Sequence, residues 1–260
     1  MIIKLEPEIL QAVEKPARYT GHELNAVHKD WDSTPCHFAL ALPDVYEVGM
    51  SNLGLKILYE VLNAREDTAC ERVYAPWIDM EEIMRQRQIP LFSLESFHAI
   101  KEFDFLGFSL QYEMIYSNVL NMLDLAGIPI WSRDRGENDP FIVGGGPCVY
   151  NTEPIADFFD FFIVGEGEEL ICETVDVFRS WQEAGKPEGR QGLLKRLAVL
   201  DGIYVPSLYN VTYNQQGLFA DIETACPEAK PIIYKRLIKD MDSVRFVEKP
   251  VLPYIDIVHD

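Results

Sequence analysis

Four short polar segments recur along the chain, each directly after an apolar run. They are PDVYEVGMS (43–51), SLQYEM (109–114), GGGPCVYN (144–151) and GEGEE (165–169). If the apolar runs are parallel strands, all four segments lie at the carboxyl edge of one sheet, where open α/β folds bind their ligands. The pattern therefore predicts a ligand-binding edge built from loops.

Glycines dominate two of these segments. Gly144, Gly145 and Gly146 remove every Cβ at one strand end, so a bulky ligand could approach the backbone, although a tight strand-to-helix turn would explain them equally well. Glu166 and Gly167 precede an expected helix, where the macrodipole alone would favour carboxylates. The chain has neither a G-x-G-x-x-G at a helix start nor a G-x-x-x-x-G-K-[ST], which disfavours dinucleotide and triphosphate sites.

Residues for hydrolytic or metal chemistry are scattered. The five histidines show no HxH or HExxH spacing, and no G-x-S-x-G elbow occurs. The five cysteines form no CxxC, zinc or iron–sulfur pattern, because no two of them lie within four residues. Unclustered thiols of this kind are typical of core residues in a cytosolic protein. The residues alone thus indicate a ligand-binding domain without an obvious reaction centre.

Alternating apolar runs and amphipathic segments place these loops in a fold. We expect strands at 36–43, 71–76, 90–94, 104–110, 128–131, 140–146 and 159–165, and helices at 52–63, 79–88, 114–127 and 166–181. Strands that alternate with helices predict right-handed crossovers and a mostly parallel sheet covered on both faces. The fold class is therefore α/β with a doubly wound, Rossmann- or flavodoxin-like sheet over 35–200, preceded by an extension at 1–34.

The pattern changes in the region 201–260. Two short alternating runs flank the turn at 214–217 and predict a β-hairpin connector. The stretch 226–250 then carries six Lys/Arg against four acids, which suits either a docking surface or a solvated linker. The chain closes on VLPYIDIVHD, a strand-like run without a visible partner, and this suggests a fragment of a longer protein.

Overall charge and apolarity narrow the function classes. With 23 Lys+Arg and 42 Asp+Glu the net charge is −19, which repels phosphate backbones and argues against a nucleic-acid partner. No apolar run approaches the length of a membrane span, and the first residues are too acidic for a signal peptide. We therefore expect a cytoplasmic protein with no membrane partner.

The loop motifs resemble those of cobalamin-binding domains, which carry D-x-H-x-x-G, then S-x-L, then G-G. Here Asp44-x-Tyr46-x-x-Gly49 takes the first place, Ser109-Leu110-Gln111 the second and Gly144-Gly145 the third, with Tyr46 replacing the histidine and Gln111 replacing the leucine. Longer strings, among them PDVYEVGMSNLGLKILYEVLN and IVGGGPCVYNTEPIADFFDFFIVGEGEE, are similar to the N-terminal half of an uncharacterised family of cobalamin-binding-type radical SAM proteins.

The resemblance implies cobalamin as the ligand and the chain's own C-terminal radical SAM domain as its partner. It implies that this second half follows a segment like YIDIVHD, opens with C-x-x-x-C-x-x-C, and holds a [4Fe–4S] cluster and S-adenosylmethionine. The implied cofactor-binding residues are Asp44, Tyr46, Gly49, Ser109, Gln111, Tyr112, Gly144, Gly145, Gly146, Glu166 and Gly167.

The tyrosine at position 46 bears on how cobalamin would be held. A phenol is neutral at pH 7 and coordinates cobalt poorly, so we expect the nucleotide tail in the sheet crevice and no histidine on the lower cobalt face. Two alternatives remain open. One is a non-catalytic scaffold that has lost cobalamin and docks the barrel or a macromolecular substrate. The other is a different small ligand, such as a nucleotide, in the same crevice.

Overall fold

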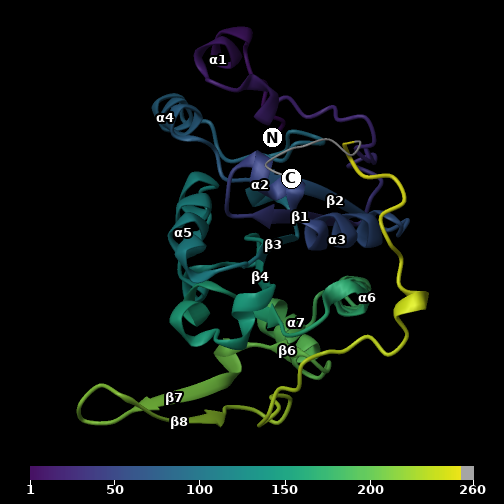
Figure 1. Cartoon of the computed structure of the whole chain (residues 1–260). Helices are drawn as coiled ribbons and strands as arrows, with labels where there is room; N and C mark the ends of the chain where they lie inside the picture. Colours follow the sequence, from purple (N-terminus) through teal and green to yellow (C-terminus); the bar gives the residue numbers. More distant parts are fainter. Residues whose placement is uncertain (253–260) are drawn as a thin grey trace.

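A six-stranded sheet forms the centre of the computed structural model, which describes residues 1–252 (Figure 1). Its order is β2 (Thr68–Tyr74), β1 (Cys36–Leu42), β3 (Phe105–Ser109), β4 (Phe141–Gly145), β5 (Phe161–Ile163) and β6 (Ile203–Tyr204). The first five strands run parallel and β6 is antiparallel to β5. The direction of winding reverses between β1 and β3, so the carboxyl ends of these strands flank a topological switch point.

Helices cover both faces of this sheet, as a doubly wound fold requires. The helices are α1 (Pro7–Ala12), α2 (Tyr46–Ser51), α3 (Leu53–Asn63), α4 (Ile78–Arg87), α5 (Tyr116–Leu125), α6 (Gly167–Glu183) and α7 (Gly189–Ala198). Helices α3, α6 and α7 lie on one face of the sheet and α4 and α5 on the other. On β1, Phe38 and Leu40 pack with α3, α6 and α7, whereas Ala39 and Ala41 pack with α4 and α5. Because alternate residues of a strand face opposite sides, a continuous apolar run is needed to bury both faces.

The structure confirms the expected fold class. The doubly wound, mostly parallel sheet is present, and the hairpin forms from β7 (Tyr209–Tyr213) and β8 (Phe219–Thr224) around the predicted turn. This hairpin is a separate two-stranded antiparallel sheet that projects from the body below β6 (Figure 1). The terminal run YIDIVHD lies outside the described residues.

Several expected elements are wrong in detail. The segment 128–131 is not a strand, because Trp131 packs its ring against Phe158 in a helical turn region with no ladder partner among the described residues. The segment 90–94 contributes only an isolated bridge between Phe92 and Ala99. Helix α2 occupies residues expected to be a loop, and α7 was not expected at all.

The end of the described chain meets the N-terminal extension at Asn25. The Asn25 backbone N–H donates to Val251 O at 3.1 Å, and the Asn25 amide donates to Pro250 O at 2.8 Å. Among the basic residues of 226–250, Arg236 pairs with Glu169 and Glu173 on α6, and Lys230 pairs with Asp201. These ion pairs attach the connector to α6 and to the turn that contains Asp201.

No helix within residues 1–252 is both long enough and apolar enough to cross a bilayer.

Candidate ligand-binding site

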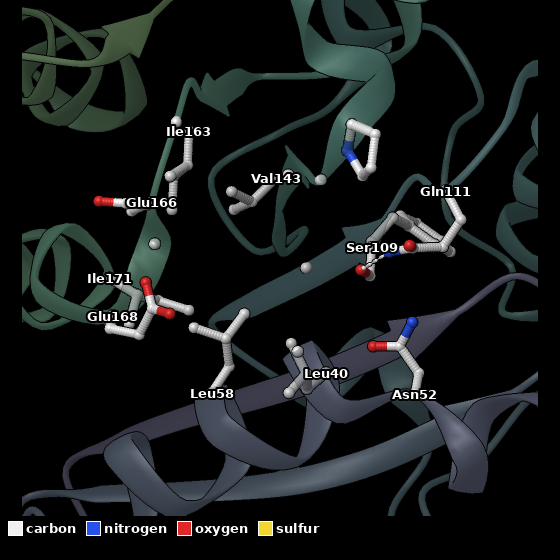
Figure 2. Close-up of a pocket in the computed structure, with 18 of the residues that line it drawn as sticks. Leu40, Asn52, Leu58, Ser109, Gln111, Val143, Ile163, Glu166, Glu168 and Ile171 are labelled. Carbon is white, nitrogen blue, oxygen red and sulfur yellow. Dashed lines mark hydrogen bonds between the residues drawn. The ribbon is translucent and has the colours of Figure 1, made fainter. Parts of the chain in front are cut away.

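A pocket of about 300 Å³ opens at the carboxyl edge of the sheet, between the strands and helices α3 and α6 (Figure 2). It lies over the ends of β1, β3, β4 and β5 and therefore includes the switch point, where sheets of this strand order bind ligands. Its lining is Phe38, Leu40, Asn52, Gly54, Leu58, Gly107, Phe108, Ser109, Gln111, Val143, Gly145, Gly146, Pro147, Ile163, Gly165, Glu166, Gly167, Glu168 and Ile171.

The middle of the pocket is apolar. Leu40, Val143 and Ile163 come from β1, β4 and β5, and Leu58 and Ile171 come from α3 and α6, which face these strands (Figure 2). These side chains alternate with residues that face the opposite side of the sheet, so the same strand pattern that builds the core also builds this surface. A flat, apolar group would bury its faces here with a gain of roughly 25 cal/mol per Å² removed from water.

Polar groups stand at two ends of the pocket (Figure 2). At one end the Gln111 amide nitrogen donates to Ser109 Oγ at 2.7 Å, and Asn52 caps α3 by accepting from the Leu55 backbone N–H at 2.8 Å. At the other end lie the carboxylates of Glu166 and Glu168. The lining contains no Lys, Arg or His, so it offers no cation for a terminal phosphate and no imidazole for a metal.

The three consecutive glycines serve three different purposes. Gly145 lines the pocket, and a Cβ there would meet nothing within 4 Å, so a side chain would project into the open space. Gly146 also lines it, with φ at 98°, and its Cβ would come 2.8 Å from Leu110 O. Gly144 is buried and does not line the pocket. It faces the other side of the sheet, where a Cβ would collide with the Phe162 ring. The triplet is therefore only partly a ligand feature.

The first predicted loop lies outside the pocket. Asp44 Oδ1 accepts from the Val45 backbone N–H at 2.7 Å, and Asp44 O accepts from the Ala75 N–H. Gly49 sits within α2, where a Cβ would collide with the Tyr74 ring. Tyr112 is 46% exposed and is not part of the lining. Of the residues expected to bind a cofactor, six line the pocket: Ser109, Gln111, Gly145, Gly146, Glu166 and Gly167.

Tyr46 takes part in a buried polar network instead. Its hydroxyl donates to Glu23 Oε1 at 2.9 Å, and its ring meets Tyr74 edge-on. Burial and the neighbouring Glu23 carboxylate raise the pKa of the Tyr46 phenol above its ordinary value, so the group stays neutral. A neutral phenol that already donates its proton to a carboxylate is a poor cobalt ligand.

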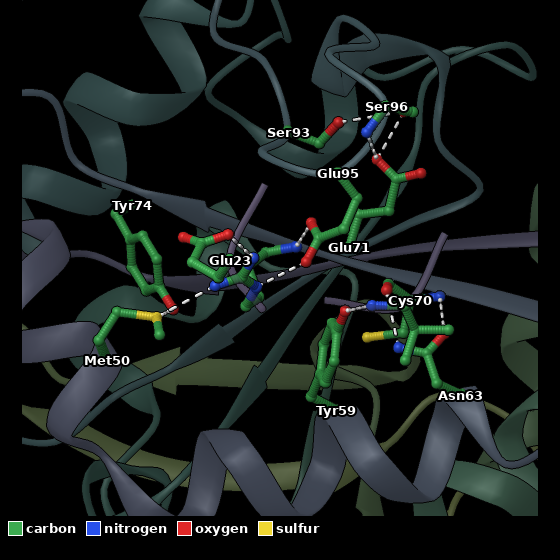
Figure 3. A network of polar contacts seen from close by, with 12 residues as sticks. Glu23, Met50, Tyr59, Asn63, Cys70, Glu71, Tyr74, Ser93, Glu95 and Ser96 are labelled. Atoms are coloured by element: carbon green, nitrogen blue, oxygen red, sulfur yellow. Dashed lines mark hydrogen bonds and ion pairs between the residues drawn. The ribbon is translucent and has the colours of Figure 1, made fainter. Parts of the chain in front are cut away.

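Arg72 is the centre of this network. Figure 3 shows its partners Glu23, Met50 and Glu95 gathered around one point beside β2. Arg72 is 2% exposed, and its guanidinium donates to Glu95 Oε1 at 2.5 Å, to Glu23 Oε2 at 2.7 Å and to Met50 Sδ at 3.1 Å. Burial alone would raise the pKa of the Glu23 carboxyl, but the bond to Arg72 and its charge outweigh burial and lower that pKa. The network joins the N-terminal extension, α2 and β2.

Sequence reasoning did not identify this network, since residues 23, 72 and 95 are far apart along the chain. One signal was available. Glu71 and Arg72 open the segment 71–76 that was expected to be a strand, and a guanidinium that a sheet buries needs carboxylate partners.

The connector is attached to the rim of the pocket. The Glu166 backbone N–H donates to Arg236 O at 3.1 Å, and the Glu166 carboxylate accepts from the Ile238 N–H. Gly165 bridges to Arg236 in parallel, and a Cβ on Gly165 would collide with the Arg236 backbone. Glu166 thus serves both the pocket and the segment that crosses its edge.

No group of three or more His, Cys, Asp or Glu residues within 1–252 is arranged to hold a metal ion.

Comparison with known proteins identifies the family to which the chain belongs. The model of the family "Radical SAM proteins, N-terminal" matches residues 54–206, which include all of the lining outside β1 and Asn52. An uncharacterised protein of Methanocaldococcus jannaschii is 26% identical over 228 residues, covering 80% of this chain and 44% of the relative. The chain therefore spans less than half the length of that relative. No solved structure matches.

Proposed function

The chain belongs to the family of N-terminal domains of radical SAM proteins, and on that premise we propose that it is a cofactor-binding module that holds cobalamin by its nucleotide tail. The observation that carries this proposal is the open, apolar pocket at the switch point of the sheet. The pocket lies at the carboxyl ends of strands β1, β3, β4 and β5, and doubly wound sheets bind their ligands at this edge.

The residues present fit the tail better than they fit the metal. Leu40, Leu58 and Val143 offer an apolar surface for a flat nucleotide base, and Gly145 leaves room for it. The position of the usual histidine, Tyr46, is bound to Glu23 and lies outside the lining. We therefore infer that the protein supplies no ligand to the lower cobalt face.

We propose that the partner of this module is a C-terminal radical SAM domain of the same polypeptide, with a [4Fe–4S] cluster and S-adenosylmethionine. Cobalamin bound here would enable that domain to carry out methyl transfer or a related radical rearrangement. The five cysteines of the chain are unpaired, which supports a reducing, cytoplasmic setting. The net charge of −19 supports a module that does not bind nucleic acid.

The direct test is retention of hydroxocobalamin. The protein is incubated with it and desalted, and its absorption spectrum is recorded. We expect the wild type to keep the colour, with a spectrum that lacks coordination by a protein histidine.

A pair of variants makes this test specific. Gly145→Val places an isopropyl group in the pocket and should abolish retention, whereas Gly136→Val, in an exposed loop at the opposite edge of the sheet, should not. Loss of colour from a folded wild type would contradict the proposal and favour the scaffold function.

A further inference from the structure

The neutral polar end of the pocket leads us to propose that the site selects an adenine-type base: a planar ring in which a ring nitrogen stands beside an exocyclic amine. This inference rests on the proposed cofactor-binding function and names the chemical class of base that the pocket takes. The residues that would read the base are Ser109 and Gln111.

The Ser109–Gln111 pair has unused hydrogen-bond capacity. The Gln111 amide nitrogen donates to Ser109 Oγ at 2.7 Å. That bond leaves the Ser109 hydroxyl hydrogen free to donate elsewhere and leaves Gln111 Oε1 free to accept. Within residues 1–252 neither of these two groups has another hydrogen-bond partner. The pocket therefore presents one donor and one acceptor side by side.

Both groups belong to one short segment. Ser109 ends β3 and Gln111 follows two residues later, so the strand fixes their spacing. Their mutual hydrogen bond holds the pair together at the same end of the pocket (Figure 2). An adenine edge matches this pair, because its ring nitrogen accepts from a hydroxyl while its amine donates to an amide oxygen.

A benzimidazole base matches only half of the pair. It has a ring nitrogen for Ser109 but no amine for Gln111 Oε1, which would then be covered without a partner. An unpaired polar group in a covered site is costly, and sites built to hydrogen-bond a group discriminate against analogues that lack it. We expect a preference for the adenine-type base on the order of tenfold or more.

The rest of the lining limits what can carry this base. Glu166 and Glu168 stand at the far end, and no cationic side chain lines the pocket. Terminal phosphates are therefore repelled. The base can come from two sources that share this chemistry: the lower nucleotide of an adenine-bearing cobamide, or a free adenosine.

Gln111 also distinguishes this chain from the motif that it resembles, in which leucine stands at this position. Leucine cannot accept a hydrogen bond. Gln111→Leu should therefore remove the preference for the amine while keeping the apolar surface.

The test measures dissociation constants on the full chain for three probes: adenine-bearing cobamide, dimethylbenzimidazole-bearing cobalamin and adenosine. The wild type should bind the adenine-bearing cobamide about tenfold or more tightly than cobalamin. Gln111→Leu should bring the two values together, and the exposed control Gln191→Leu on α7 should leave the preference intact. Ser109→Ala serves as the second variant and should weaken binding of the adenine-bearing cobamide.

The possible results separate the base selectivity from the cofactor-binding function. Equal affinities in the wild type, or a preference for cobalamin, would overturn the inference and leave the cofactor-binding function standing. Binding of adenosine alone, lost in Gln111→Leu, would support the base selectivity and overturn the cobamide function. Binding of none of the three probes would overturn both.

Discussion

Two parts of the same sheet edge differ in whether the protein fills the space at the strand ends. After β1 the chain turns directly into α2, and the volume at the strand end is filled by the protein itself. After β3, β4 and β5 the chain leaves an open pocket of about 300 Å³. Both parts carry residues that resemble a cobalamin motif, yet only the second leaves room for a ligand.

The difference follows from where the polar groups find partners. Tyr46 donates to Glu23, and Glu23 accepts from Arg72, so the polar side chain of the first loop is already satisfied by hydrogen bonds within the protein. Ser109 and Gln111 bond to each other and retain unused capacity toward the pocket. A motif residue is therefore available to a ligand only when its neighbours do not already satisfy it.

The largest expected effect comes from disrupting the Arg72 network beside the first loop. Arg72→Met removes the guanidinium and leaves the carboxylates of Glu23 and Glu95 buried without their cation. Breaking a buried ion pair on one side costs about 3–5 kcal/mol in the free energy of unfolding, measured by urea denaturation. The surface variant Arg87→Met, which loses an exposed pair with Glu6, should cost less than about 1 kcal/mol. Equal effects of the two variants would show that the network does not hold the N-terminal extension in place.

Two adjacent glycines separate packing from ligand binding. Gly144→Ala forces a methyl group against Phe162 and should lower the free energy of unfolding by about 3 kcal/mol. Gly145→Ala meets no protein atom and should change that free energy by less than about 0.5 kcal/mol. The same methyl group enters the pocket, so hydroxocobalamin should bind more weakly. A destabilised Gly145→Ala with normal binding would reverse the assignment of the two faces.

The network should also respond to acid. Glu23 has a lowered pKa in the folded protein, so its contribution is full above its unfolded pKa of about 4.3 and is lost as the pH falls through the folded value. Glu23→Gln should cost about 2 kcal/mol at pH 7 by urea denaturation, and this cost should shrink toward pH 3. Glu8→Gln, on the exposed side of α1, is the matched control and should cost little at either pH. A cost for Glu23→Gln that grows on acidification contradicts the assigned direction.

The smallest expected effect concerns the tyrosine at the position of the motif histidine. Tyr46→Phe removes one hydrogen bond to Glu23 and should lower the free energy of unfolding by about 1 kcal/mol. Hydroxocobalamin affinity should stay unchanged, because Tyr46 does not line the pocket. A marked loss of affinity in a stable Tyr46→Phe protein would place the first loop in the binding site.

Local pattern predicted most of the sheet and part of the pocket. The continuous apolar runs of β1 and β3 are unmistakable, since both faces of these strands are buried. Helix α7 was missed because GRQGLLKRLA contains two glycines and three cations, which obscure the buried leucines at 193, 194 and 197. The apolar run at 128–131 was expected to be a strand, but it has no ladder partner within residues 1–252.

Contacts between distant segments account for the rest. Ser109, Gln111 and Gly145 follow strands and could be placed at the carboxyl edge from the sequence. Leu58 and Ile171 could not, because their role depends on how α3 and α6 lie across the sheet. The closure of the first loop depends on Glu23, which lies in an irregular extension that no periodicity places.

Cobalamin retention after desalting, compared between Gly145→Val and Tyr46→Phe, tests the central claim most directly. We expect Tyr46→Phe to keep the colour of the wild type and Gly145→Val, still folded by circular dichroism, to lose it. Retention by Gly145→Val together with loss from Tyr46→Phe would show that the ligand binds at the first loop and not in the open pocket.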